Sequence, residues 1–142
     1  KRTICIPVDE SKTTTSAIQW AIDHLIQPET DQVILLNVRE SPQTGAYPLM
    51  VSESTYDFLA TKLKEHSHDL LRTKAKLLTS LNIHVRAISL CGVPKIELEY
   101  KINQLQPSLV IMGKRGMGVV KSLLIGSVSE HLLHHVKVPI TI

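Results

Sequence analysis

Short apolar runs alternate with amphipathic segments along the chain, and this alternation limits the fold more than any other feature of the sequence. The segments between the runs carry apolar side chains at the three- and four-residue spacing of a helix. Strands that alternate with helices pair in parallel and are joined by right-handed crossovers. The sequence therefore predicts an α/β three-layer sandwich, in which a five-stranded and mainly parallel sheet carries helices on both faces. The predicted strands are residues 3–8, 32–38, 83–88, 108–112 and 137–142.

Four helices are predicted between these strands. Ile18 and Ala21 lie on one face of the first helix, where Trp20 is expected to be a packing residue. Pro94 suits the first turn of the third helix, and residues 127–135 form the fourth. The second helix is long, and its expected apolar stripe comprises Leu59, Leu63, His66, Leu70, Leu77, Leu78 and Leu81.

Length and composition predict a single domain spanning residues 1–142. With 142 residues and 43% hydrophobic content, the chain can bury its own core without disulfides or structural metals. Residues 40–52 contain Pro42, Gly45 and Pro48 and show little periodicity. We therefore expect an irregular loop there rather than a further helix or strand.

Composition also disfavours several classes of function. The longest apolar runs fall far short of the ~20 residues that span a membrane, and residues 1–7 lack the apolar core of a signal peptide. A cytoplasmic protein without membrane contact is expected. The net charge is only +3, and one Trp, three Tyr and one Phe offer few surfaces for stacking bases, so nucleic-acid binding is not expected. Cys5 and Cys91 lack the spacing of a disulfide framework and are predicted to be buried thiols.

Four of the six glycines fall within the fourteen residues 113–126, between the fourth strand and the fourth helix: Gly113, Gly116, Gly118 and Gly126. Glycine lets backbone amides approach a ligand closely, and a helix N-terminus favours negative charge. Lys114, Arg115 and Lys121 add positive charge, while Ser127 and Glu130 fit a capping box. The loop is therefore predicted to bind phosphate groups.

Two standard phosphate-binding motifs do not match this loop. A Walker loop requires Gly-Lys followed by Ser or Thr, whereas Gly118 is followed by Val119-Val120. A dinucleotide fingerprint joins a strand directly to a helix, whereas here the helix begins several residues after Gly118. The loop is therefore neither a P-loop nor a standard dinucleotide site.

The spacing Gly113, two residues, Gly116, nine residues, then Gly126-Ser127 resembles the signature of the universal stress protein family. The likeness extends over essentially the whole chain, from Ile6-Pro7-Val8-Asp9 to the final strand. The resemblance implies a Rossmann-like fold, similar to that of the adenine nucleotide alpha hydrolases. It further implies binding of ATP, or of ADP or AMP, together with Mg²⁺.

The resemblance also implies roles for individual residues. Asp9 would contact the ribose or a bound metal ion, and Pro7 and Val8 would lie at the adenine and ribose. Val38 would meet the edge of the adenine through its backbone, and Met112 and Gly113 would border the sugar. Lys114 departs from the small hydroxyl residue that is common in the family. The phosphates would be held by Arg115, Gly116, Gly126, Ser127, Val128 and Ser129.

The sequence contains no recognisable catalytic constellation, since Asp9, Ser127 and Ser129 are the plausible helpers for hydrolysis. We expect a nucleotide-dependent regulator or sensor in a stress response. One alternative is a slow metal-assisted ATPase or phosphotransferase, and another is a partner-binding module in which nucleotide is incidental. A response-regulator receiver is disfavoured, because the third strand is followed by no phosphoacceptor aspartate.

Two further features concern partners and metals. The apolar final strand, residues 137–142, is expected at a sheet edge, and by resemblance it would mediate a homodimer. His131, His134 and His135 have helical spacings that suit a metal, yet the sequence around them offers no carboxylate or cysteine to complete a ligand set. They are therefore expected to be solvated or to face a dimer partner.

Overall fold

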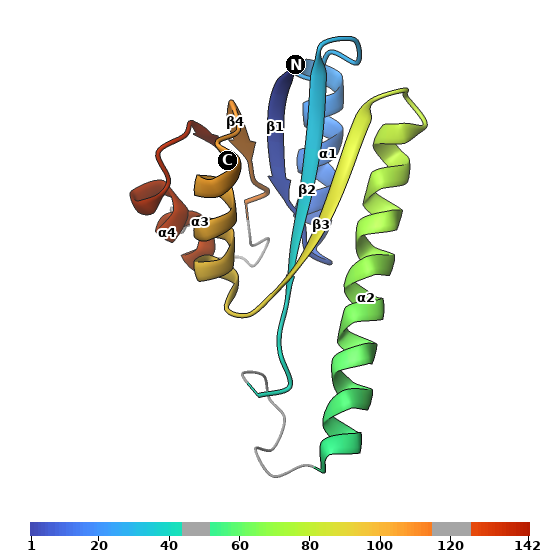
Figure 1. The fold of residues 1–142 in the computed structure, drawn as a ribbon. Coiled ribbons are helices and arrows are strands. Elements are labelled where there is room, and N and C mark those ends of the chain that lie inside the picture. Colours follow the sequence, from blue (N-terminus) through green and yellow to red (C-terminus); the bar gives the residue numbers. More distant parts are fainter. Residues whose placement is uncertain (44–51, 115–125) are drawn as a thin grey trace.

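The computed structural model describes residues 1–43, 52–114 and 126–142, and strands alternate with helices throughout these ranges (Figure 1). This alternation confirms the α/β prediction. The elements are β1 (Arg2–Pro7), α1 (Lys12–His24), β2 (Asp31–Arg39), α2 (Glu53–Thr79), β3 (His84–Cys91), α3 (Pro94–Leu105), β4 (Leu109–Ile111), α4 (Ser127–His135) and β5 (Ile140–Thr141).

The strands form a five-stranded sheet in the order β3-β2-β1-β4-β5, and every neighbouring pair is parallel. From β1 the chain proceeds outward to β2 and β3, then returns to the other side of β1 for β4 and β5. The order thus reverses between β1 and β4, which pair through Ile4↔Leu109 and Cys5↔Val110. In open α/β sheets, the crevice beyond the strand ends at such a reversal is where ligands bind.

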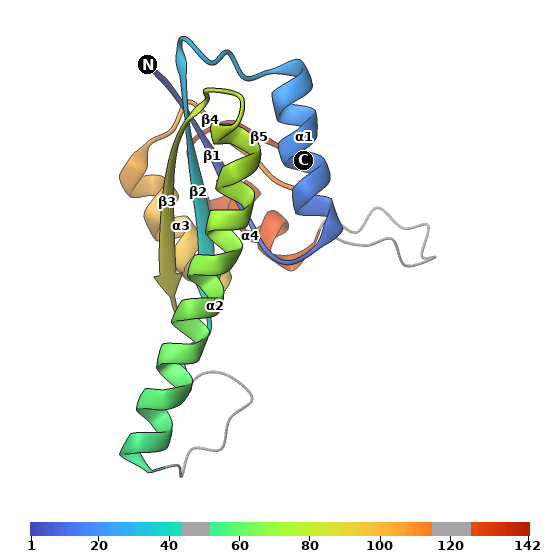
Figure 2. The ribbon, with the colours of Figure 1, turned by 90° about the vertical axis from the view of Figure 1, so that its right-hand side faces the viewer.

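Helices cover both faces of the sheet, as the sequence predicts (Figures 1 and 2). Against one face pack α1, through Ile18 and Ala21, and α2, through Leu71 and Leu78. Against the other face pack α3 and α4; their buried residues Leu98, Ile102 and Leu132 meet the opposite side chains of β1, β2 and β4. Burial of these two apolar layers holds the sandwich together.

Several local predictions were wrong. Trp20 is 45% exposed and stacks on His24 instead of packing in the core. The buried face of α2 contains Ser67, Leu71 and Leu78, whereas Leu77, which the predicted stripe included, is 39% exposed. β5 is limited to Ile140–Thr141, shorter than the predicted 137–142. Helical spacing alone did not show which of several overlapping stripes faces the sheet.

The two cysteines are free thiols in different environments. Cys5 is fully buried in β1, and this burial raises the pKa of its thiol to about 12. Cys91 is exposed at the end of edge strand β3, so its predicted burial was wrong. No helix in residues 1–43, 52–114 or 126–142 has the length and apolar content needed to cross a membrane.

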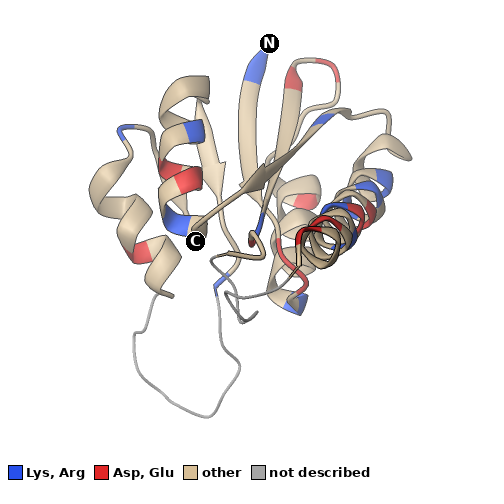
Figure 3. Ribbon diagram, turned by 60° about the horizontal axis from the view of Figure 1, so that its bottom comes forward, with Lys and Arg blue, Asp and Glu red and all other residues tan. Residues whose placement is uncertain are grey.

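The exposed surface of α2 carries both signs of charge along its length (Figure 3). Lys62 lies 3.5 Å from Glu65, and Arg72 lies 3.1 Å from Asp69, each pair one helical turn apart. Exposed pairs of this kind stabilise a helix only slightly. The charges of α2 therefore form a mixed, solvated face.

An ion pair joins the first residues of β1 and β2, at the amino ends of these strands. The reversal between β1 and β4 opens at the other end, where the strands finish. The Arg2 guanidinium donates to both carboxylate oxygens of Asp31, with its Nη2 lying 2.6 Å from Oδ2. Asp31 is 1% exposed and also accepts from the Gln27 amide at 2.8 Å. Burial opposes ionisation of this carboxyl, but the hydrogen bonds from Arg2 and Gln27 outweigh it and hold its pKa below the ordinary value.

Candidate functional site

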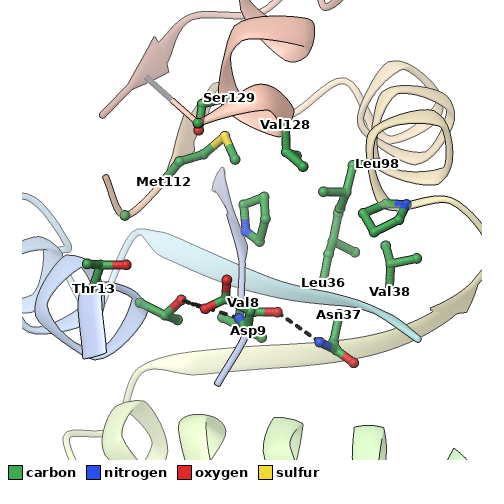
Figure 4. A pocket seen from close by; sticks show the side chains of 15 residues that line it. Val8, Asp9, Thr13, Leu36, Asn37, Val38, Leu98, Met112, Val128 and Ser129 are labelled. Atoms are coloured by element: carbon green, nitrogen blue, oxygen red, sulfur yellow. Dashed lines mark hydrogen bonds between the residues drawn. The ribbon is translucent and has the colours of Figure 1, made fainter. Parts of the chain in front are cut away.

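A pocket of about 150 Å³ opens at the carboxyl edge of the sheet, at the reversal between β1 and β4 (Figure 4). It is built where β1, β2 and β4 end and where α1, α3 and α4 begin. Its lining residues are Pro7, Val8, Asp9, Thr13, Thr14, Leu36, Asn37, Val38, Pro94, Leu98, Met112, Gly113, Gly126, Val128 and Ser129.

One wall of the pocket is apolar. Leu36 and Val38 reach it from β2, and Leu98 reaches it from α3 (Figure 4). Met112, which directly follows β4, and Val128 of α4 complete this wall. Leu36 is fully buried, and Leu98 and Met112 are 5% and 8% exposed, so these side chains are fixed by packing. Such a wall suits a flat, weakly polar ring.

The backbone of Val38 offers hydrogen-bonding groups beside this wall. Leu36 accepts from the Val8 amide at 2.7 Å, so the main-chain groups of Leu36 face β1. In a strand, the groups two residues further on face the same side, and the β1–β2 register ends at Pro7↔Leu36. The amide and carbonyl of Val38 therefore point to the side on which β1 has already ended its pairing.

A buried polar network lies where β1 stops pairing with β2. Asn37 Nδ2 donates to the Val8 carbonyl at 2.9 Å, and Ser67 Oγ donates to Asn37 Oδ1 at 2.6 Å. Ser89 and Arg39 extend the network at 2.7 Å each. Asn37 was not predicted as a site residue, although a polar side chain that interrupts the apolar run between Val33 and Val38 is a visible signal.

Asp9 closes the β1–α1 loop at the polar side of the pocket. Its Oδ1 accepts from the Ser11 amide at 2.9 Å, from Thr14 Oγ1 at 2.7 Å and from Ser11 Oγ. Thr14 Oγ1 also accepts from the Asp9 amide at 3.3 Å. Asp9 thus orders the first turn of α1 and brings its carboxylate to the pocket, and its expected contact with ribose or metal stays a prediction.

Gly113 passes so close to α1 that only glycine fits. A Cβ atom at this position would lie 2.6 Å from the carbonyl oxygen of Thr13 and 3.0 Å from the amide nitrogen of Thr14. The sequence analysis attributed the glycines of this region to ligand approach. For Gly113 the structure gives a second reason, which is the close contact between the β4 end and the first turn of α1.

The N-terminus of α4 contributes backbone donors to the pocket. The first hydrogen bond within the helix runs from the Glu130 amide to the Gly126 carbonyl, at 2.9 Å. The amides of Ser127, Val128 and Ser129 therefore have no acceptor inside the helix. Gly126 is the N-cap and has no side chain that could accept from the first turn, so the predicted capping box of Ser127 and Glu130 was wrong: Ser127 is already the first helical residue.

Nine predicted site residues meet in this pocket: Pro7, Val8, Asp9, Val38, Met112, Gly113, Gly126, Val128 and Ser129. Ser127 begins α4 next to them but does not line the pocket. Arg115 and Gly116 lie outside the described residues. The prediction missed six lining residues, which come from α1, β2 and α3: Thr13, Thr14, Leu36, Asn37, Pro94 and Leu98.

Comparison with known proteins extends these observations. The model of the universal stress protein family matches residues 1–142. The chain is 31% identical over 165 residues to universal stress protein PHOS32 of Arabidopsis thaliana, covering all of this chain and 64% of that protein. It is 24% identical over 139 residues to universal stress protein MJ0531 of Methanocaldococcus jannaschii, covering 98% of this chain and 79% of that protein. The chain thus spans less than two thirds of the plant relative.

Solved structures show the same fold. The structure of protein MJ0577 of Methanocaldococcus jannaschii gives a TM-score of 0.80 at 24% identity and covers 98% of this chain and 92% of that one. An Arabidopsis thaliana protein of the universal stress protein family with AMP bound gives 0.72 at 16% identity, covering 99% and 90%. A universal stress protein in complex with cAMP gives 0.66 at 14% identity, covering 99% and 94%. These similarities confirm the Rossmann-like architecture.

Proposed function

The chain belongs to the universal stress protein family, and we propose that it binds an adenine nucleotide, ATP with Mg²⁺, in the pocket between β1 and β4 and acts as a nucleotide-dependent regulator. The observation that carries this proposal is the position of the α4 N-terminus. Gly126, Val128 and Ser129 at the start of this helix line the same pocket as the apolar wall, beyond the β1 and β4 ends. An apolar wall beside amides that have no acceptor within their own helix is complementary to a base joined to phosphate groups.

The adenine is proposed to lie on the apolar wall formed by Leu36, Leu98 and Val128. Its polar edge would exchange hydrogen bonds with the backbone of Val38, whose main-chain groups face the side that β1 leaves open. A backbone amide and carbonyl recognise a donor–acceptor pair on a base in the way that a neighbouring strand does. This placement gives adenine selectivity without a polar side chain.

The ribose and phosphates are proposed to occupy the polar half of the pocket. Asp9 would meet the ribose hydroxyls or the Mg²⁺ ion, with Met112 and Gly113 beside the sugar. Gly126 and the amides of Ser127, Val128 and Ser129 would hold phosphate oxygens, together with Arg115 and Gly116 of the signature. Bound Mg²⁺ would neutralise charge on the phosphates.

Two solved structures of similar fold support an adenine ligand, since one has AMP bound and the other cAMP. Among the lining residues that the structure describes, Asp9 is the only titratable side chain, so a paired acid and base for hydrolysis is not formed by this set. We therefore propose a binding and signalling role in the stress response, in which ATP turnover is slow or absent.

Calorimetric titration with ATP–Mg²⁺ and with AMP tests this proposal, and phosphate release is followed in the same samples. The sharpest variant is Ser127→Pro, which deletes one amide donor. Proline suits the first helical position, and Gly126, with φ −57° and ψ 155°, has a conformation that a following proline accepts. Ser127→Ala is the matched control, because it removes the hydroxyl and keeps the amide.

Ser127→Pro is expected to weaken ATP binding about 10- to 100-fold, the equivalent of one hydrogen bond to a charged group. Ser127→Ala should bind several-fold more tightly than Ser127→Pro. Asp9→Asn should also weaken binding, whereas Asp23→Asn on the exposed face of α1 should not. Undetectable binding by the unaltered chain at millimolar ATP would exclude the proposed function. Equal binding by Ser127→Pro would place the phosphates elsewhere.

A further inference from the structure

Two histidines of α4 and one carboxylate of α3 converge outside the nucleotide pocket. Glu99, His131 and His135 each present a ligand atom, and these atoms lie within 4.8 Å of one another. Glu99 is 32 residues from His131 in sequence, which is why the sequence analysis found no carboxylate near the histidines. We propose that Glu99, His131 and His135 form a binding site for a divalent transition-metal ion of the Zn²⁺ type, which joins α3 to α4.

The three side chains lie close together on two neighbouring helices. His131 and His135 are four residues apart on α4 and therefore share one face of the helix. Their rings are stacked, with centroids 4.0 Å apart and an interplanar angle of 13°. Glu99 Oε2 lies 2.6 Å from His131 Nε2, and these two side chains are 30% and 17% exposed. Glu99 and His131 are therefore held between two helices that lie side by side (Figure 1), whereas His135 is exposed.

The hydrogen bond of His135 leaves one of its ring nitrogens available for a metal. His135 Nδ1 lies 2.7 Å from the His131 carbonyl oxygen, which can only accept, so Nδ1 carries the proton. The lone pair of this ring is then on Nε2, as in metal-binding histidines that donate their other N–H to a carbonyl. At His131, the ion would replace the proton between Nε2 and the Glu99 carboxylate.

The donor set selects the class of metal. Two imidazoles and one carboxylate suit Zn²⁺ and its neighbours Co²⁺, Ni²⁺ and Cu²⁺, whereas Mg²⁺ and Ca²⁺ prefer oxygen ligands alone. Zinc bonds of about 2.0–2.2 Å place tetrahedral ligand atoms about 3.3 Å apart. The observed separations, from 2.6 Å to at most 4.8 Å, bracket this distance, and metal binding would turn the stacked rings so that their nitrogen atoms face one ion.

Two further observations favour a cation at this place. The histidines lie in the last two turns of α4, where the helix dipole favours positive charge. Asn103, one turn after Glu99 on α3, donates to the His135 carbonyl at 3.3 Å. Its Oδ1 is buried and has no hydrogen-bond partner within the described part of the chain, and a water on the open position of a three-ligand metal would supply one.

Calorimetric titration of the untagged, metal-free and nucleotide-free chain with ZnCl₂ tests the site, together with thermal unfolding. The unaltered chain is expected to bind one Zn²⁺ and to unfold at a higher temperature when it is bound. Mg²⁺ should have no such effect. Glu99→Gln and His135→Gln should each weaken Zn²⁺ binding at least tenfold. Because His135 is exposed, its substitution should leave the fold intact, which circular dichroism checks.

Two controls separate this site from other zinc ligands of the chain. His134→Gln removes an exposed histidine of the same helix, and Cys91→Ser removes the exposed thiol; both should bind Zn²⁺ as the unaltered chain does. Absence of Zn²⁺ binding at 100-fold excess, or full binding by both Glu99→Gln and His135→Gln, would overturn the proposal. Loss of binding in Cys91→Ser would also overturn it, because the metal would then be held by the thiol.

Discussion

Substitution of Gly113 by alanine should damage the site from within the fold. The new Cβ would lie 2.6 Å from the Thr13 carbonyl oxygen, 2.7 Å from its carbonyl carbon and 3.0 Å from the Thr14 amide nitrogen. All three atoms belong to the backbone of the first turn of α1, so no side-chain rotation relieves the clash. The contact requires a displacement of roughly 0.5–1 Å between α1 and the β4 end.

Overpacking of this kind costs about 1–3 kcal/mol. A domain of this size loses about 3–4 °C of Tm for each kcal/mol, so the expected fall in Tm is about 3–12 °C. Thermal unfolding followed by circular dichroism measures it. Because Thr13 and Thr14 line the pocket and Thr14 holds Asp9, ATP affinity should fall as well.

A double variant checks the physical reason. Since the clash involves main-chain atoms, removing the Thr13 side chain should not relieve it. The Tm of Thr13→Ala combined with Gly113→Ala should therefore be no higher than that of Gly113→Ala alone. Recovery of stability in the double variant would mean that the Thr13 side chain causes the strain. A Tm for Gly113→Ala equal to or above that of the unaltered chain would refute the argument entirely.

The remaining predictions concern the opposite sheet edge, the thiols and the oligomeric state. Asp31→Asn should lower the free energy of unfolding by about 1–3 kcal/mol at pH 7 in urea titrations. Because the folded-state pKa of Asp31 is depressed, the difference in stability between the unaltered chain and this variant should shrink as pH falls below about 4. A difference that stays constant with pH would contradict this reasoning. Native protein at pH 8 should react with Ellman's reagent at Cys91 alone, because Cys5 is buried with a thiol pKa of about 12; rapid reaction of both would contradict this. Sedimentation should show a dimer at about 50 μM, because β5 is an edge strand that can pair with a second copy. Ile142→Lys should dissociate this dimer, since Ile142 is 42% exposed beside that strand. A monomer at this concentration would exclude dimerisation through β5.

The sequence predicted the elements of the fold well because their signals are local. Helix α4 has the predicted bounds, and Pro94 begins α3 as expected. Parallel pairing followed from the βα alternation, whereas the strand order, which places the pocket, was known only from the structure. In each case a periodicity or a connection rule within one stretch of chain carries the information.

Side chains that meet across elements were predicted less well. Leu98 and Thr14 line the pocket because of how α3 and α1 dock on the sheet, and no periodicity in either helix shows this. Glu99 meets His131 for the same reason. Cys91 shows the limit for strands, since edge and interior strands have similar apolar patterns but different exposure.

The length of β1 connects a local feature of the sequence, the polar Asn37, with the position of the pocket. β1 stops pairing with β2 at Pro7, while β2 continues to Arg39 beside β3. This difference exposes the main chain of Val38 on one side and leaves the Val8 carbonyl to be satisfied by Asn37. A longer β1 would pair with Val38 and fill the place proposed for adenine. The polar Asn37, which interrupts the apolar run of β2, therefore marks the point where the sheet opens, and its buried hydrogen bond with Ser67 holds the side chain that satisfies Val8.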